Sequence, residues 1–464
     1  MMRFRHLCSL LILSAATALY GGPTNSILFV TQVPIPADFG TIASTFGNHQ
    51  GVPATCGRGG DLYIRYPDGT LKNLTRAAGY GQWGQQAPNG IAVRQPCVHW
   101  SGQKAVFSMV VGSPTNINSI APYYWQLYEI TNFTSPNTVP VITKVPNQPT
   151  NFNNIAPIYG SEDQIIFTSD RPRNGQPQLY PQLDEYEELA TVTGLWSLQP
   201  TNGELFMINH TPSGAFSPTL DSAGRIVFVR WDHLQRDQQA DTDWENGYIT
   251  YGAFNWSDES SNSYATTNLT EEYPEPRPVR TDLLAGTGLS GNTFNQFFPW
   301  AICQDGTDEE TLNHIGRHEI GGSYASASFT NDPNIQDLYY YGANYNTNTI
   351  DNFLDVREDP NVQGLFYGVD APEFATHGAG QIVSITGNTN INAFYMLINY
   401  LTPRSTHTYA DSPTNVPPDD TGMYRNPIMT SDGYMIAAHT TNTQAETDAD
   451  TVSYPGTNYP FTSF

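Results

Sequence analysis

The chain has 464 residues, and its 20 Lys and Arg against 44 Asp and Glu give a formal net charge of −24. Such a chain repels phosphate groups, which argues against a nucleic-acid-binding protein and against a polybasic membrane binder. Only 14% of the residues are charged, whereas 27 Tyr, 22 Phe, 39 Gly and 34 Pro favour many short strands and turns over long helices.

The N-terminal segment has the pattern of a secretory signal peptide. Arg3 and Arg5 precede an apolar run over residues 7–18, and its end supplies small residues for cleavage. We therefore predict a signal peptide over residues 1–22 and a secreted or periplasmic protein. A membrane anchor is the alternative, but the run is shorter than the roughly 18 residues that a span needs. Since no apolar run of that length follows, no membrane span is expected after cleavage.

A repeated unit organises the rest of the chain. Each copy begins with Pro, passes through a short strand to a turn residue six positions on, and continues into an apolar strand. Clear copies begin at Pro96, Pro157, Pro218 and Pro427, and weaker ones at Pro299 and Pro372. The first two intervals are equal, since 157 − 96 and 218 − 157 are both 61.

Hairpin patterns lie between these copies. Residues 62–75 and 195–205 each read as strand, Asx-Gly turn and strand, at Asp68-Gly69 and Asn202-Gly203. Two hairpins per unit make a four-stranded antiparallel sheet, and a radial array of such sheets is a β-propeller. We therefore predict an all-β chain with a single propeller domain over residues 23–464. Six unit starts indicate six blades with long inter-blade loops, with seven as the alternative, and the N-terminal strands are expected to complete the last blade.

The repeats resemble the TolB-like propeller family, whose units read Pro-x-x-Ser-x-x-Gly-x-x-Ile-x-Phe-x-Ser; residues 165–171 fit this pattern well. Longer patches are similar to secreted proteins related to the middle, propeller domain of the hydrazine synthase alpha subunit. They cover residues 27–34, 58–71, 229–232, 311–319 and 371–381. The activity of that enzyme depends on covalently attached c-type haems. Because this chain has no C-x-x-C-H, we expect no covalent haem and do not carry the activity over.

Two clusters could bind a divalent metal such as Zn²⁺ or Ca²⁺. His314 and His318 share a face on a helix or on a strand, and His377 could be a third zinc ligand, with Glu319 or Glu373 as base. The alternative is that these are polar residues that fix a loop by hydrogen bonds. An acidic loop supplies oxygen ligands of the kind that Ca²⁺ takes, at Asp237, Asp241, Asp243 and Glu245. It does not follow the EF-hand pattern, so a solvated loop is the competing interpretation.

Three cysteines follow the signal segment: Cys56, Cys97 and Cys303. A disulfide between Cys56 and Cys97 would suit an oxidising compartment, whereas buried free thiols are the alternative. The G-x-G-x-x-G at residues 286–291 lacks the strand and helix that a nucleotide site requires, and no G-x-S-x-G hydrolase motif is present.

These observations favour a secreted propeller that acts as a binding or assembly module without its own redox cofactor. Its acidic, aromatic-rich loops would meet a protein, a carbohydrate or a cation. One alternative is a metal-dependent enzyme with its site on the axial face of the propeller. Another is an accessory subunit that pairs with a separate cytochrome in a haem-containing complex.

Overall fold

The structure is a computed structural model. It describes residues 23–32, 58–81, 90–112, 123–171, 194–209, 215–233, 253–254, 265–266, 295–312, 352–371, 378–388, 398–403 and 418–441. This part of the chain is built almost entirely of antiparallel strands, which confirms the all-β prediction. Its one described helix is the single turn α2 (Leu74–Ala77), capped by Asn73. No described helix has the length and apolar character that crossing a membrane requires.

Four sheets have four strands each, and in every one the strands lie side by side in sequence order. The first two are β4 (Ile91–Val98), β5 (Lys104–Val111), β6 (Gln126–Thr131) and β7 (Val141–Lys144), then β8 (Asn154–Tyr159), β9 (Ile165–Ser169), β10 (Gly194–Gln199) and β11 (Glu204–Met207). The next two are β12 (Ala215–Leu220), β13 (Ile226–His233), β16 (Asn295–Ile302) and β17 (Glu310–Thr311), then β18 (Asn352–Asp359), β19 (Val362–Ala371), β20 (Gln381–Thr386) and β21 (Asn399–Tyr400).

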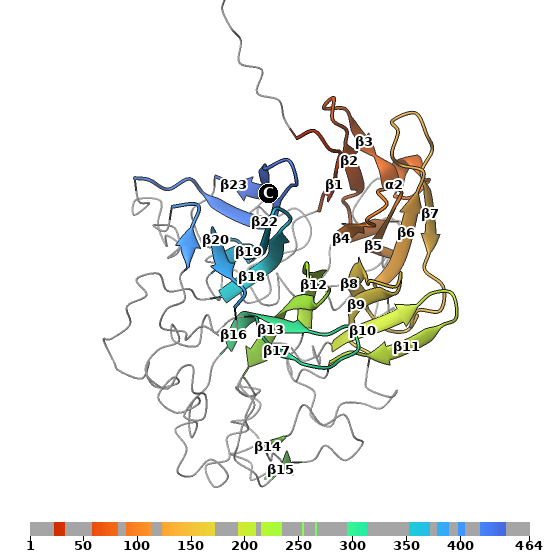
Figure 1. The fold of residues 1–464 in the computed structure, drawn as a ribbon. Helices are drawn as coiled ribbons and strands as arrows, with labels where there is room; N and C mark the ends of the chain where they lie inside the picture. The colour runs from red at the N-terminus through yellow and green to blue at the C-terminus, as the bar shows by residue number, and fades with distance from the viewer. Residues whose placement is uncertain are drawn as a thin grey trace, which may run out of the picture.

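Three smaller sheets accompany them. They are β1 (Ile27–Val30), β2 (Leu62–Arg65) and β3 (Leu71–Asn73), the ribbon of β22 (Met423–Met429) and β23 (Met435–Thr440), and a short pair, β14 (Ala253–Phe254) with β15 (Ala265–Thr266). The large sheets surround a common centre, with the ribbon β22–β23 and the sheet β1–β3 at the two ends of the series (Figure 1). The fold is a β-propeller. The hairpins predicted over residues 62–75 and 195–205 are present as β2–β3 and β10–β11.

The predicted number of blades, six or seven, is wrong: the structure has five, which are the sheets of three or four strands. Pro299 lies in β16, the third strand of its sheet, so it does not begin a blade, and Pro372 lies outside the described residues. The blade expected at Pro372 begins instead at β18, where Val356 occupies the position that Pro holds elsewhere. Pro427 begins only the ribbon β22–β23.

The predicted closure by a shared blade is also not found among the described strands. There β1 pairs with β2, and no ladder joins β1 to β23. Instead, the backbone N–H and the hydroxyl of Thr24 donate to Oδ2 of Asp432, at 2.7 and 2.8 Å. Asp432 lies in the turn between β22 and β23, so side-chain hydrogen bonds link the two ends of the series of sheets.

A β-bulge explains the repeated proline. The first strands β4, β8, β12, β18 and β22 each shift register against the next strand, once in four of them and twice in β18. In each of these strands one non-glycine residue at a shift has a positive φ of about 50°: Gln95, Ala156, Ser217, Asp355 and Asn426. Proline directly follows four of these residues. Since the ladder is interrupted at a bulge, a residue without an N–H is accommodated there.

The second strands bury both of their faces between neighbouring sheets. Three fully buried phenylalanines of the repeat motif each lie opposite an aromatic residue of the third strand. The pairs are Phe107 with Tyr128, Phe167 with Trp196 and Phe228 with Trp300. Burial on both sides is why these strands read in the sequence as continuous apolar runs.

Candidate functional site

The turns that join the first two strands of the four-stranded sheets and the two strands of the ribbon β22–β23 lie on one face of the ring. They cover residues 99–103, 160–164, 221–225, 360–361 and 430–434, and the β16–β17 turn over residues 303–309 is bonded to them through Gln304. We call these turns together the turn face. Hydrogen bonds connect them in series around the ring, so the face is held as one surface. The links are His99 to Asp163, Gln304 to Ser161 and to the Gly224 carbonyl, Ser222 to Glu358, and Asn361 to the Thr430 carbonyl.

His99 is fixed at both ring nitrogens. The backbone N–H of Ser101 donates to Nδ1 at 3.1 Å, so Nδ1 is the acceptor. We therefore assign the proton to Nε2, which donates to Oδ1 of Asp163 at 2.8 Å. This hydrogen bond is the main reason that the pKa of Asp163 lies below its usual range. His99 is buried and joins the turns of two neighbouring blades.

Trp100 lies on top of this fixed imidazole. Its side chain is 61% exposed, although its ring centroid is only 4.0 Å from that of His99. The rings of His99 and Tyr159 are nearly perpendicular, with an interplanar angle of 86° and centroids 4.8 Å apart. The indole is thus presented to solvent while its orientation is set by buried groups beneath it.

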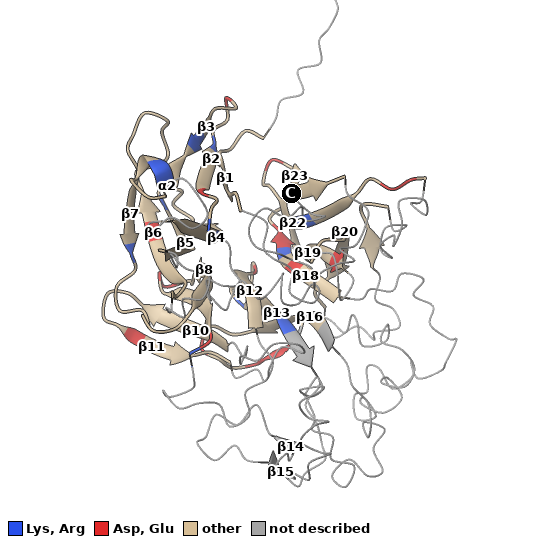
Figure 2. Cartoon of the chain, turned by 180° about the vertical axis from the view of Figure 1, so that it is seen from behind, with Lys and Arg blue, Asp and Glu red and all other residues tan. Residues whose placement is uncertain are grey.

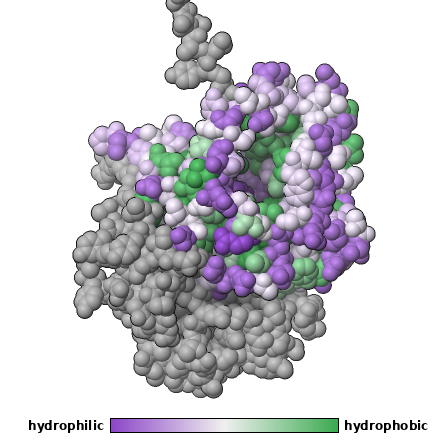
Figure 3. All heavy atoms as spheres, in the orientation of Figure 1, coloured by the Kyte–Doolittle hydropathy of each residue, from purple (hydrophilic) through white to green (hydrophobic). Residues whose placement is uncertain are grey.

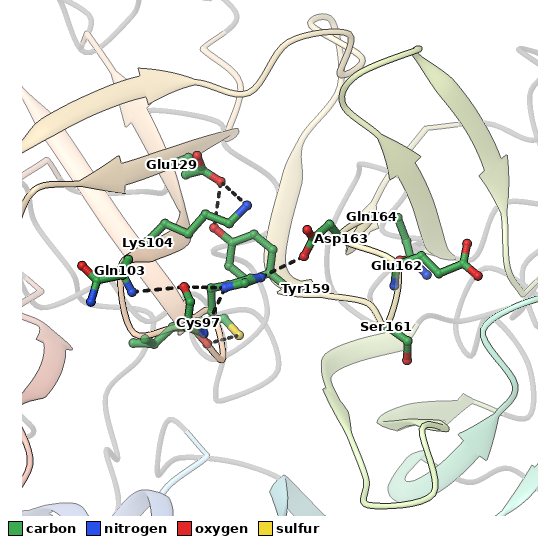
Figure 4. Close-up of polar contacts among 12 residues, drawn as sticks. Cys97, Gln103, Lys104, Glu129, Tyr159, Ser161, Glu162, Asp163 and Gln164 are labelled. Carbon is green, nitrogen blue, oxygen red and sulfur yellow. Dashed lines mark hydrogen bonds and ion pairs between the residues drawn. The ribbon is translucent and has the colours of Figure 1, made fainter.

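Lys104, Glu129 and Tyr159 form the polar base of the site (Figure 4). The Tyr159 hydroxyl donates to Oε2 of Glu129 at 2.9 Å, and the Lys104 ammonium lies 3.4 Å from the same oxygen and 4.8 Å from the Tyr159 ring centroid. Burial, and then the charge of Glu129, raise the pKa of Tyr159 far above its usual range. The phenol therefore remains a hydrogen-bond donor, and the three groups join β5 and β6 to β8.

The carboxylates of the turn face keep their charge because neutral groups donate to them. Thr307 donates to Asp305 from both its backbone N–H and its hydroxyl, at 3.0 and 2.7 Å, which lowers the pKa of Asp305. Hydrogen bonds from Thr430 and Thr24 lower the pKa of Asp432 to about 2. Figure 2 shows such acidic segments in red at turns and strand ends.

Two basic side chains near these turns are already engaged. Lys104 pairs with Glu129, and Arg225 pairs with Asp221 at 2.9 Å. The turn face thus combines ionised carboxylates with an exposed indole. Exposed apolar side chains also lie on β4, on β22 and in the β22–β23 turn: Val98, Ile428 and Tyr434.

Most residues singled out in the sequence lie outside the described residues. These are His314, His318 and His377, the acidic residues Asp237, Asp241, Asp243 and Glu245, and Cys56. Both metal sites and the Cys56–Cys97 disulfide therefore stay predictions. Cys97 lies in β4, with its thiol 3.8 Å from the Val98 carbonyl oxygen. Within the described ranges, no group of three His, Cys, Asp or Glu side chains is placed to hold a metal ion.

Sequence reasoning identified the turn carrying His99 and Trp100 only as a copy of the repeat. One signal could have found the site. Trp100 stands four residues after its Pro, where the other three clear copies have Ser161, Ser222 and Ser431. A large aromatic residue at a turn position that otherwise holds serine indicates a role other than forming the turn.

Comparison with known proteins finds similarity in fold. No family model and no curated protein matches the chain. Hydrazine synthase of Kuenenia stuttgartiensis matches with a TM-score of 0.48 and 13% identity, over 90% of this chain and 42% of that chain. TolB from Acinetobacter baumannii matches with a TM-score of 0.36 and 9% identity, over 84% of this chain and 59% of that chain. The resemblance to both proteins predicted from the sequence is thus also found in structure, and it concerns the fold alone.

Proposed function

We propose that this chain is a β-propeller binding module whose turn face docks a basic partner protein. The observation that carries the proposal is Trp100, which is 61% exposed and yet fixed on the buried His99 ring. Residues 1–22 support a secreted or periplasmic location for this module.

A fixed, exposed tryptophan suits a docking site for two reasons. Tryptophan is among the residues that dominate binding energy when a partner covers them. Because His99 and Tyr159 already hold the indole in place, little side-chain freedom remains to be lost on binding. The residues that follow it in the turn, Ser101 and Gly102, are small.

The charge of the face selects the partner. Asp163, Asp305 and Asp432 accept hydrogen bonds that lower their pKa values, so they remain ionised well below neutral pH. An acidic surface accelerates encounter with a basic protein and rejects an acidic one. A basic cytochrome is a partner with this chemistry. It would carry the haem itself, whereas this chain has no C-x-x-C-H to which a haem could be attached.

The test is titration of the purified mature chain with a small basic cytochrome c in a calorimeter, at low and at physiological salt. We expect binding that weakens as salt rises. Trp100→Ala should weaken it about tenfold or more, which corresponds to about 1.4 kcal/mol. Phe206→Ala is the matched control, since Phe206 is an exposed aromatic residue on the outer strand β11.

Two results would reject the proposal. One is equal affinity of the Trp100→Ala variant and the unaltered chain. The other is equally tight binding of an acidic protein of similar size, which would show that the charge of the turn face selects nothing.

A further inference from the structure

A second polar site lies where the first strands converge at the centre of the ring. Arg357, on β18, donates from Nη1 to the Pro218 carbonyl on β12 at 3.3 Å. It also interacts electrostatically with the thiol of Cys97 on β4. The first strands follow one another around the ring in the order β4, β8, β12, β18 and β22. Side chains of β4 and β18 can therefore meet only near the axis.

The guanidinium of Arg357 is incompletely satisfied. Its hydrogen bonds go from Nη1 to two backbone carbonyls, those of Pro218 and Val356. Its Nε and Nη2 make no hydrogen bond to the described residues, and no described carboxylate forms an ion pair with it. These two nitrogens form the side of the guanidinium that binds both oxygens of an oxyanion.

The described carboxylate near Arg357 is shared with a second guanidinium. Asp355 is the carboxylate that interacts electrostatically with Arg357, and it interacts with Arg425 as well. Oδ2 of Asp355 also accepts the backbone N–H of Asn426 at 3.0 Å. Burial raises the pKa of Cys97 more than its hydrogen bond to Tyr159 and the charge of Arg357 lower it, so the thiol adds no negative charge at neutral pH.

The centre of the molecule has space for a ligand. Figure 3 shows the surface hollowed near the middle of the ring, with hydrophobic residues along part of the wall. Arg357 and Cys97 are both partly exposed. A cationic group in a confined, partly apolar space attracts anions more strongly than the same group in open solvent.

We propose that the centre of the ring binds a small oxyanion, a carboxylate or a phosphate group, through Nε and Nη2 of Arg357. Cys97, whose thiol interacts electrostatically with Arg357, reports on the occupancy of this site. The site is independent of the turn face, because it uses neither Trp100 nor the acidic turns.

The experiment titrates the mature chain separately with inorganic phosphate and with citrate, and measures the rate at which iodoacetamide alkylates Cys97 by peptide mass spectrometry. An anion on Arg357 screens its charge from the thiol and covers it, so we expect alkylation of Cys97 to slow at least threefold at saturation. Cys303 serves as the internal control. The anion with the lower dissociation constant identifies the source, carboxylate or phosphate.

Three variants locate the effect. Arg357→Gln should weaken anion binding at least tenfold, and Arg357→Lys should weaken it less, because it keeps the charge but loses the paired donors. Arg225→Gln, on the turn face, should bind as the unaltered chain does. If Arg357→Gln fails to fold by circular dichroism, Arg357→Lys carries the test.

The proposal is overturned if neither anion changes the Cys97 rate, or if Arg225→Gln loses as much affinity as the Arg357 variants. Titration with the basic cytochrome does not involve Arg357. Failure of the anion site can therefore be distinguished from failure of the turn face.

Discussion

Replacing Asp170 with Asn should remove a pH-dependent loss of stability. Asp170 follows β9, and its two carboxylate oxygens accept the backbone N–H and the side-chain Nδ2 of Asn153, both at 2.7 Å. Burial nevertheless raises its pKa from 3.8 to about 6, against the effect of these hydrogen bonds. The folded chain therefore holds a proton on Asp170 at pH values where the unfolded chain has lost it.

The sign and size follow from this difference. Between about pH 4 and pH 6 the folded state binds more protons than the unfolded state, so the free energy of unfolding falls as pH rises. A difference of about two pH units corresponds to a loss of about 3 kcal/mol. The Asn of the Asp170→Asn variant does not titrate, so the variant lacks this loss. The free energy of unfolding of the variant minus that of the unaltered chain should therefore increase by about 3 kcal/mol between pH 3.5 and pH 7.

Equilibrium urea unfolding at intervals of half a pH unit measures this comparison, because other titrating groups cancel between the two chains. Asp305→Asn is the control, since Asp305 is exposed and its pKa is lowered rather than raised. A constant difference between Asp170→Asn and the unaltered chain across this range would refute the reasoning. A difference that shrinks with rising pH would also refute it.

Two further predictions concern packing and buried polar groups. Gly422 and Gly433 both have positive φ, but an added Cβ would lie 1.9 Å from the Thr440 carbonyl oxygen at Gly422 and meets nothing within 4 Å at Gly433. Urea unfolding should show a loss of roughly 3 kcal/mol for Gly422→Ala and of about 1–2 kcal/mol for Gly433→Ala, and equal losses would contradict the steric argument. Glu129→Ala removes the acceptor of the buried Tyr159 hydroxyl and should cost about 1–3 kcal/mol. Adding Tyr159→Phe should then restore part of that loss in a double-mutant cycle, whereas strictly additive losses would exclude the coupling.

The sequence patterns predicted the fold well where local chemistry repeats. Pro96, Pro157, Pro218 and Pro427 all lie in first strands, because each follows the left-handed residue of a bulge. The same reasoning failed at Pro299, since a proline in an apolar run also fits the third strand β16. It missed β18 because Val356 breaks the pattern while the bulge itself persists at Asp355.

The candidate site was harder to predict because its partners are distant in the chain. His99 and Asp163 are 64 residues apart, close to the 61-residue interval between units. This spacing predicts a contact only if the turns of neighbouring units are already known to meet. Arg357 and Cys97 belong to blades separated by two others, and no spacing in the sequence relates them. The His and Asp clusters were predicted from their residue types and spacing, and they lie outside the described residues.

The link between Thr24 and Asp432 has a mechanical consequence. Within a blade such as β8–β11, separating two strands means breaking several backbone hydrogen bonds together. Among the described residues, the sheet β1–β3 and the ribbon β22–β23 are joined by two hydrogen bonds to a single carboxylate oxygen. Tension across the ring would therefore break the hydrogen bonds to Asp432 first. The sheet β1–β3 and the ribbon β22–β23 would then separate while the strands within each blade stay paired.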